Sequence, residues 1–197
     1  MITLDDIRTE TGIDSITAPM NKGVLLDPWM FDAMCSDDFY RKNGKVYDFN
    51  VHLDDYGIDL QRPYVWALFQ QKAFIMSVLL EKPIDCFVVV MHRRADGDDT
   101  VNVIDGKQRL LTIHKFLHNE FPITVGGKEV YWRDFDGGLR RFFRSHVNSF
   151  AANIYYSDET EPISDRDKIV LFNYYNFSGT PQTDEHKNKL QSLIREE

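Results

Sequence analysis

The segment Asp105-Gly106-Lys107-Gln108-Arg109 gathers an acid, an amide and two cations where a strand-like pattern changes to a helix-like one. Cations are disfavoured in the first turn of a helix, because the backbone dipole is positive there. A phosphate would remove this penalty, since free backbone N–H groups, Lys107 and Arg109 would all face negative charge. The segment therefore predicts a phosphate site. The alternative, in which both cations only reach solvent or nearby carboxylates, stays open.

Two further residues of this segment suit a nucleotide. Gly106 would let a ligand approach the backbone closely, and Asp105 could hold Mg²⁺ between phosphates or orient an attacking water. The chain has no P-loop, because no Gly-Lys pair has another glycine five residues before its own glycine or a Ser or Thr after its lysine. A nucleotide site here would thus be of another kind.

The elements that must position this segment follow from hydrophobic periodicity. Residues 66–81 predict a helix, 85–92 a strand, 100–104 a strand antiparallel to it, and 107–119 a helix. Further along, the pattern predicts a hairpin over 121–135, a helix over 139–146, a strand over 149–156, a helix over 164–175 with Ser164 as N-cap, and a last helix over 183–195. The fold class is α+β, with a small mixed sheet and helices packed on it.

The first 50 residues carry no motif of this kind. They predict short helical pieces and turns, with a helix beginning at Pro28 and a turn at Asn43-Gly44, which could form a tight hairpin, before residues 45–51. We therefore treat residues 1–50 as an N-terminal extension and residues 51–197 as the nucleotide-binding domain.

Composition limits the function classes. The net charge is -8, from 31 acidic and 23 basic residues, which argues against a protein that coats nucleic acid through phosphate contacts alone. Two local basic clusters remain, 92–94 and the arginines 140, 141 and 144. Neither a membrane span nor a signal peptide is evident, and two cysteines make no disulfide framework, so we expect a cytoplasmic protein.

Three segments, in order, resemble the boxes of the DGQQR-motif family, the domain of unknown function 262. They are Gln61-Arg62-Pro63-Tyr64-Val65-Trp66, then 105–109 followed by Leu110-Leu111-Thr112-Ile113, then the stretch from Phe172 to Pro181 with Thr183-Asp184-Glu185. The family occurs in GmrSD-type modification-dependent restriction systems and in phosphorothioate-sensing defence proteins. Two positions depart from its pattern: Lys107 replaces the first Gln of DGQQR, and Gln182 replaces an apolar residue.

The resemblance implies a ParB/sulfiredoxin-like nucleotide-binding core that hydrolyses a nucleoside triphosphate with Mg²⁺. In that reading Asp105 is the catalytic or metal-positioning acid, Gln108 orients water or a phosphate oxygen, and Arg109 clamps phosphate. Gly106 and Lys107 would contact the nucleotide beside them.

The other two boxes add residues to the same implied site. Gln61 and Arg62 would approach the nucleotide, with Tyr64 or Trp66 shaping the pocket. Asn176, Gly179 and Thr180 would form a loop near it.

We therefore expect a stand-alone domain that binds and hydrolyses a nucleoside triphosphate and serves DNA modification, restriction or phage counter-defence. Relatives usually carry a C-terminal HNH-type nuclease domain, and too few residues follow the third box for one. One alternative is a phosphotransferase or nuclease acting on nucleic acid, supported by Lys107 and the arginines 140, 141 and 144. Another is a non-catalytic binding module for protein or DNA. DNA, a protein contacting residues 1–50 and a second copy of the chain all stay open as partners.

Overall fold

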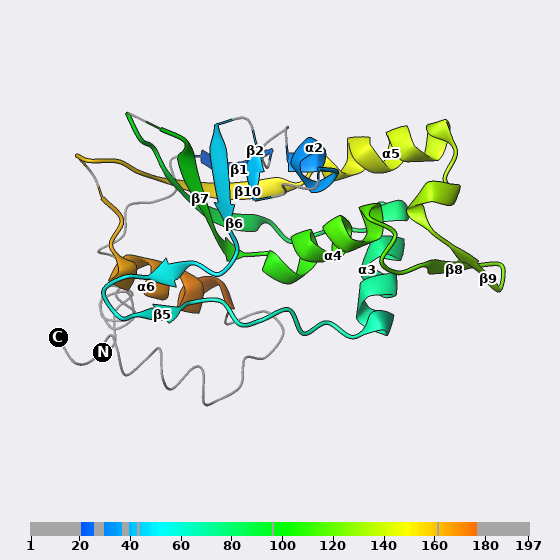
Figure 1. Ribbon diagram of the computed structural model, residues 1–197, viewed down its shortest axis with the longest axis horizontal. Helices are drawn as coiled ribbons and strands as arrows, with labels where there is room; N and C mark the ends of the chain where they lie inside the picture. Colours follow the sequence, from blue (N-terminus) through cyan, green and yellow to red (C-terminus); the bar gives the residue numbers. More distant parts are fainter. Residues whose placement is uncertain are drawn as a thin grey trace, which may run out of the picture.

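The computed structural model describes residues 21–25, 30–36, 40–42, 44–95, 97–160 and 162–176, and its fold is α+β, as the periodicity predicts (Figure 1). A six-stranded mixed sheet has the strand order β1-β10-β6-β7-β3-β2. Its strands are β1 (Asn21–Leu25), β2 (Arg41–Lys42), β3 (Lys45–Asp48), β6 (Phe87–His92), β7 (Asp99–Asp105) and β10 (Ala151–Ser157).

Strand β6 lies inside the sheet, antiparallel to β7 and parallel to β10. The residues from Phe87 to Met91 are all buried, which is why this strand is a continuous apolar run rather than an alternating one. The predicted antiparallel pair is thereby confirmed. Its last residue, Asp105, ends β7 at the point where the candidate site begins.

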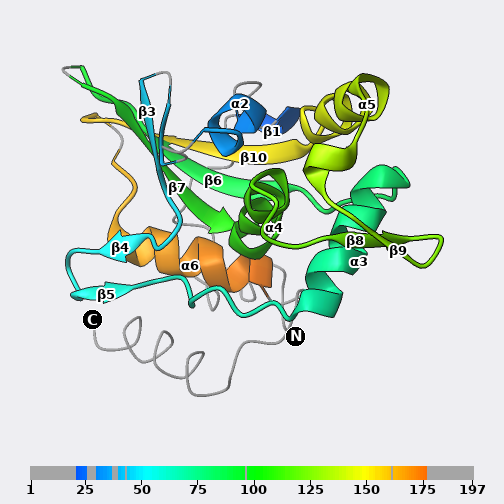
Figure 2. The ribbon, with the colours of Figure 1, turned by 45° about the vertical axis from the view of Figure 1, so that its right-hand side comes forward.

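Helices cover both faces of this sheet. The helices are α2 (Met30–Met34), α3 (Leu68–Leu79), α4 (Lys107–Leu117), α5 (Gly137–Val147) and α6 (Asp165–Asn176). One core cluster joins one sheet face to α2, α3, α4 and α5, and a second joins the other face to α6 and the β4–β5 hairpin. Figure 2 shows α6 and that hairpin together beneath the sheet.

Two short hairpins and a turn of 3-10 helix complete the described part of the chain. The hairpins are β4 (His52–Leu53) with β5 (Ile58–Asp59) and β8 (Ile123–Val125) with β9 (Lys128–Val130), and the 3-10 helix is η2 (Trp132–Asp134). The β8–β9 pair turns at Gly126-Gly127, as predicted.

The prediction of short helical pieces and turns before residue 50 was wrong for the segment that forms β1, whereas the possible hairpin at Asn43-Gly44 is present as the antiparallel pair β2–β3. Strand β1 pairs with β10, and β3 pairs with β7, so their partners lie far along the sequence and leave no local signal. The tight turn at Gly44, with φ 72°, is confirmed and joins β2 to β3. Strand β3 ends at Asp48 rather than 51, because the Asp48 carboxylate accepts the N–H groups of residues 50 and 51.

Helix ends follow local capping chemistry. The Ser164 hydroxyl accepts the Asp167 N–H while the Asp167 carboxylate accepts the Ser164 N–H, so Ser164 begins α6 as predicted. Helix α5 starts two residues before the predicted 139, because the Asp136 carboxylate caps the Leu139 N–H. The predicted helix over 183–195 and the predicted start at Pro28 lie outside the described residues; α2 is described from Met30.

A row of polar side chains crosses the sheet face that α6 covers. His92 shares a hydrogen bond of 2.8 Å with the Asn102 side chain, whose amide donates to Asp48 at 3.2 Å. Burial, helped by the nearby Lys168 ammonium, holds the pKa of His92 below its usual 6.5, while Asn102, Asp165 and Asp48 oppose that shift less strongly. The folded protein therefore keeps His92 neutral more strongly than the unfolded chain does.

This depressed pKa predicts an acid-sensitive fold. Stability is fully present above pH 6.5 and declines as the pH falls below it, since the unfolded chain takes up the proton first. His114, whose pKa burial also lowers, adds to the same loss. His92→Gln keeps a hydrogen-bonding group for Asn102 but cannot take up a proton. We expect its free energy of unfolding to fall less than that of the wild type when the pH is lowered from above 6.5 to below it. Urea unfolding of both proteins above and below pH 6.5 measures the difference, and equal losses would contradict the assignment.

Candidate nucleotide site

The site is built on the tight passage from β7 into α4 at Gly106. Gly106 has φ 113° and is buried, and a Cβ atom placed on it would lie 2.2 Å from Cδ1 of Phe87. Only glycine fits this position, so the chain turns into the helix with no side chain at its cap. Among the described residues no side chain caps the first-turn N–H groups of 107–109 either. An uncapped helix start of this kind attracts an anion.

Arg109 faces the start of β6. Its guanidinium donates to the Asp85 and Cys86 carbonyls, forms an ion pair of 2.7 Å with Asp105, and lies 4.3 Å over the Phe87 ring. The side chain is 14% exposed. Arg109 thus ties α4 to the chain entering β6, and its described contacts are to the protein itself.

Asp105 supplies the one carboxylate of the segment 105–109. Its pKa is raised because burial disfavours the charged form, although Arg109 and the Gly106 N–H offset part of that shift. The side chain keeps 31% of its surface exposed. A carboxylate that is oriented by an arginine and still open to one side suits the binding of a hard cation such as Mg²⁺.

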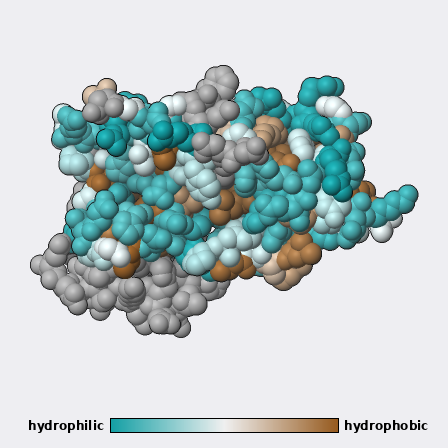
Figure 3. All heavy atoms as spheres, in the orientation of Figure 1, coloured by the Kyte–Doolittle hydropathy of each residue, from teal (hydrophilic) through white to brown (hydrophobic). Residues whose placement is uncertain are grey.

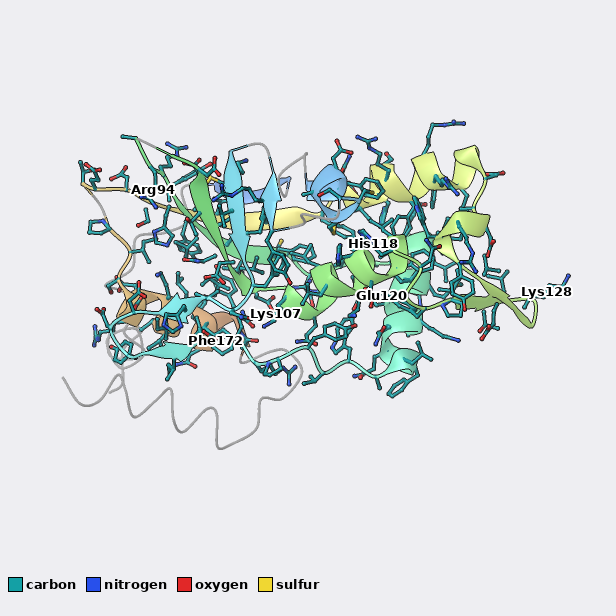
Figure 4. All side chains as sticks on the ribbon, in the orientation of Figure 1. Arg94, Lys107, His118, Glu120, Lys128 and Phe172 are labelled. Carbon is teal, nitrogen blue, oxygen red and sulfur yellow. The ribbon has the colours of Figure 1, made fainter. Side chains whose placement is uncertain are left out.

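The Lys107 side chain extends from α4 toward Asn50, which lies next to the core cluster of α6 and the β4–β5 hairpin. Its ammonium donates to the Asn50 side chain at 2.8 Å, and the residue is 5% exposed. Burial lowers the pKa of Lys107, and the Asp59 and Asp48 charges partly restore it. Figure 4 places Lys107 on the side of α6, at the opposite end of α4 from His118.

Gln108 joins the first two boxes. Its side-chain amide accepts the Val65 N–H at 2.9 Å and donates to the Pro63 carbonyl at 3.1 Å. Between these two residues, the Tyr64 hydroxyl lies 2.8 Å from that of Thr112. Because Thr112 donates its own proton to the Gln108 carbonyl, Tyr64 must be the donor to Thr112. Gln108 and Tyr64 therefore position the segment 63–65 against α4.

Gln61 anchors the other side of that segment. Its amide donates to the carbonyls of Val103 and Ile104 at the end of β7, at 2.9 and 2.5 Å. Arg62 is held between this anchor and the Pro63 contact with α4, so its backbone lies beside the start of the helix. Its side chain is half-buried and has no hydrogen bond or ion pair with any residue that the structure describes. Arg62 is thus the cation of the first two boxes with no described protein partner.

The third box reaches the site through α6. Figures 1 and 2 both show the C-terminal end of α6 beside the N-terminal end of α4. Asn176 is the last residue of α6, and its side-chain amide donates to the Phe172 carbonyl at 2.9 Å. Gly179 and Thr180 lie outside the described residues.

Comparison with family models gives a match over residues 50–196 to the N-terminal domain of the GmrSD restriction endonuclease. The chain belongs to this family. All three boxes fall inside the matched range, so the predicted resemblance is confirmed, and the chain is a domain of a restriction-related family. Neither the curated proteins nor the solved structures gave a match.

Several partners of the motif were not predicted. Asn50 binds Lys107, Thr112 binds Tyr64, and backbone carbonyls bind Arg109. Thr112 follows the motif by three residues and could have been suspected on a helix face, whereas a carbonyl acceptor leaves no sequence signal.

The structure does not support a metal site at the two histidines of α4. His114 and His118 lie four residues apart on one helix, a spacing able to bind a metal, but both contact the Met34 carbonyl, and the described residues contain no cluster of three metal-binding side chains. No helix within the described ranges is long and apolar enough to cross a membrane.

The two basic clusters do not form one surface. Figure 4 shows Arg94 at one end of the long axis, and Figure 1 places α5, with the other cluster, at the opposite end. Within α5, Arg140 donates to the Arg133 carbonyl and Arg144 pairs with Asp32 at 2.8 Å. Two of its three arginines are therefore engaged in holding the fold.

Proposed function

We propose that this domain binds a nucleoside triphosphate at the start of α4 and hydrolyses it with Mg²⁺, as part of a restriction or phage counter-defence system. The observation that carries the proposal is the uncapped first turn of α4 behind Gly106, with Asp105 just before it and Arg62 between two residues, Gln61 and Pro63, that bind the end of β7 and α4. Free N–H groups, a carboxylate that could hold Mg²⁺ and a cation with no partner among the described residues would together suit a triphosphate.

The phosphates would lie against backbone rather than against Arg109. The N–H groups of residues 107–109 point along the helix dipole toward the N-terminal end of α4, where no described side chain caps them, and phosphate oxygens would accept from them there. Arg62 would neutralise their charge from the first box. Arg109 then serves as a positioning residue, since its ion pair orients the Asp105 carboxylate.

Mg²⁺ fits this arrangement with Asp105 as its protein ligand. Magnesium commonly takes one or two carboxylates, with phosphate oxygens and waters completing its shell. When bound, the metal would neutralise charge on the phosphates. Asp105 would hold it at the end of β7, while Arg109 and the Gly106 N–H keep the carboxylate in place. Gln108 would hold the segment 63–65 against α4, because its side-chain amide already binds the Val65 N–H and the Pro63 carbonyl.

The test compares wild type and Arg62→Ala for binding of the four ribonucleoside triphosphates by calorimetry. Losing charge-assisted hydrogen bonds worth about 1.5–3 kcal/mol should weaken binding roughly 10- to 100-fold. The thermal midpoint should barely change, because the Arg62 side chain has no described partner in the protein.

Arg94→Ala is the matched control. It removes the same charge beyond the end of β6 that lies away from Asp105, and should leave affinity unchanged (Figure 4). Equal affinity in wild type and Arg62→Ala would contradict the placement of the phosphates, and no binding of any triphosphate would favour a non-catalytic protein- or DNA-binding module.

A further inference from the structure

One end of the molecule is basic although the chain as a whole is acidic. Figures 1 and 2 both show α5 and the β8–β9 hairpin at this end, and Figure 3 shows hydrophilic surface over them. Residues 128–144 include five lysines and arginines and three acids, whereas the whole chain has 23 and 31. Two of these acids, Asp134 and Asp136, use a carboxylate oxygen to accept a backbone N–H where η2 and α5 begin. The local excess of charge is therefore positive.

Three exposed arginines of this end, Arg133, Arg140 and Arg141, form no ion pair with any carboxylate that the structure describes. The Arg133 guanidinium lies 4.6 Å over the Tyr131 ring. Arg140 lies 5.5 Å over the Trp132 ring and donates to the Arg133 carbonyl at 2.8 Å. The rings and the carbonyl orient these guanidiniums without neutralising them, and a guanidinium has five N–H donors to offer. The arginines are thus arranged to meet an external anion.

The β8–β9 hairpin projects beside the arginines. Its residues 124–129 are all exposed, and Figure 4 shows Lys128 pointing away from the body of the protein. The turn residues Gly126 and Gly127 both have positive φ and carry no side chain, so the tip is narrow. A three-residue strand spans about 10 Å. The major groove of DNA is about 8.5 Å deep and admits a two-stranded ribbon. A narrow ribbon flanked by arginines therefore has the shape and charge for such a groove.

We infer that this end binds duplex DNA. Lys128, Arg133, Arg140 and Arg141, the basic end, contact its phosphates while the hairpin enters the major groove. The planar guanidinium matches two phosphate oxygens at once. Phosphate contacts carry no sequence information, so this binding is independent of sequence. The acidic remainder of the chain repels the duplex and confines it to the basic end.

The basic end is separate from the candidate nucleotide site. The Asn119 side chain, just after α4, accepts the Arg133 N–H at 2.8 Å, whereas the nucleotide site lies at the first turn of α4. The 11 residues of α4 place the two about 16 Å apart along the helix. DNA and a triphosphate therefore have room to bind together, and the inference does not rest on the proposed nucleotide chemistry.

Fluorescence anisotropy of a short labelled duplex of mixed sequence, at several salt concentrations and without nucleotide or Mg²⁺, tests the inference. Arg141→Ala removes one phosphate contact, and so does Lys128→Ala at the tip of the hairpin. For each variant we expect the slope of log K against log salt to become shallower by about 0.9, and the affinity at low salt to fall roughly 5- to 10-fold. The thermal midpoint should barely change, because neither side chain has a described hydrogen bond or ion pair.

Arg94→Ala is the matched control. It removes an exposed arginine whose backbone N–H donates to the Asp99 carboxylate, and it should leave the slope unchanged. A wild type that binds no duplex at low salt would overturn the inference, as would slopes that neither Arg141→Ala nor Lys128→Ala changes. Equal losses in Arg94→Ala would mean that total charge governs binding. Polyglutamate that competes as well as unlabelled duplex of equal charge would assign the basic end to an acidic protein instead.

Discussion

Replacing Gly106 with alanine is expected to lower the free energy of unfolding by about 3 to 5 kcal/mol, from a strained backbone and from overpacking. The backbone at φ 113° is a conformation that side-chain-bearing residues rarely adopt, and the new Cβ would lie 2.2 Å from Cδ1 and 2.7 Å from Cε1 of Phe87. Phe87 is fully buried and stacked on Phe150 with ring centroids 5.5 Å apart, so it has little room to retreat. Urea unfolding measures the loss.

Gly126→Ala separates backbone strain from the clash. Gly126 also has a positive φ, 56°, but nothing lies within 4 Å of its Cβ position. It should cost about 1 to 2 kcal/mol, the usual penalty for the left-handed conformation. Equal costs at the two glycines would show that Phe87 does not pack against Gly106 as described.

Asp105→Asn is expected to slow Mg²⁺-dependent phosphate release about 100-fold or more, the usual loss when a metal-binding or acid–base group is removed. The amide keeps an acceptor for Arg109, so the ion pair becomes a neutral hydrogen bond and the helix start should survive. Nucleotide binding without metal should change little. Phosphate release and metal-free binding, measured on the same preparation, distinguish the two effects.

Asp85→Asn is the matched control for this variant. The Asp85 charge acts on Asp105, but its contact with Arg109 is through the main-chain carbonyl, which the substitution keeps. Phosphate release should stay within a few-fold of wild type. A comparable loss in both variants would mean that the local negative potential, and not the Asp105 carboxylate as a ligand, governs the reaction.

Local patterns predict the continuous part of this fold well. The β6 and β7 strands, α4, the β8–β9 hairpin and the Ser164 cap depend on neighbours within a few residues, so periodicity and capping rules find them. Strands β1 and β3 do not, because their pairing partners β10 and β7 come much later in the chain. Their short sequences look like turns until those partners are known.

The candidate site shows the same division. The segment 105–109 was found because its charges conflict with a helix start, and the structure does place it there. The sequence could not predict which group each side chain of this segment binds. Arg109, chosen as the phosphate clamp, binds main-chain carbonyls and Asp105, and Lys107 binds Asn50. Most of those acceptors lie far from the motif in the sequence, so the pattern of residues does not predict them. For the same reason, only the structure shows that Arg62 is the cation with no partner among the described residues.

Nuclear magnetic resonance of the ¹⁵N-labelled protein tests the central claim, that a nucleoside triphosphate binds at the start of α4. A titration with a non-hydrolysable triphosphate should shift the backbone amides of residues 106–109 most, because their N–H groups would donate to phosphate oxygens. The Arg62 side-chain signal should move with them, and the amides of α5 should not. Shifts confined to α5 or to the 92–94 turn, or no shifts at all, would contradict the account.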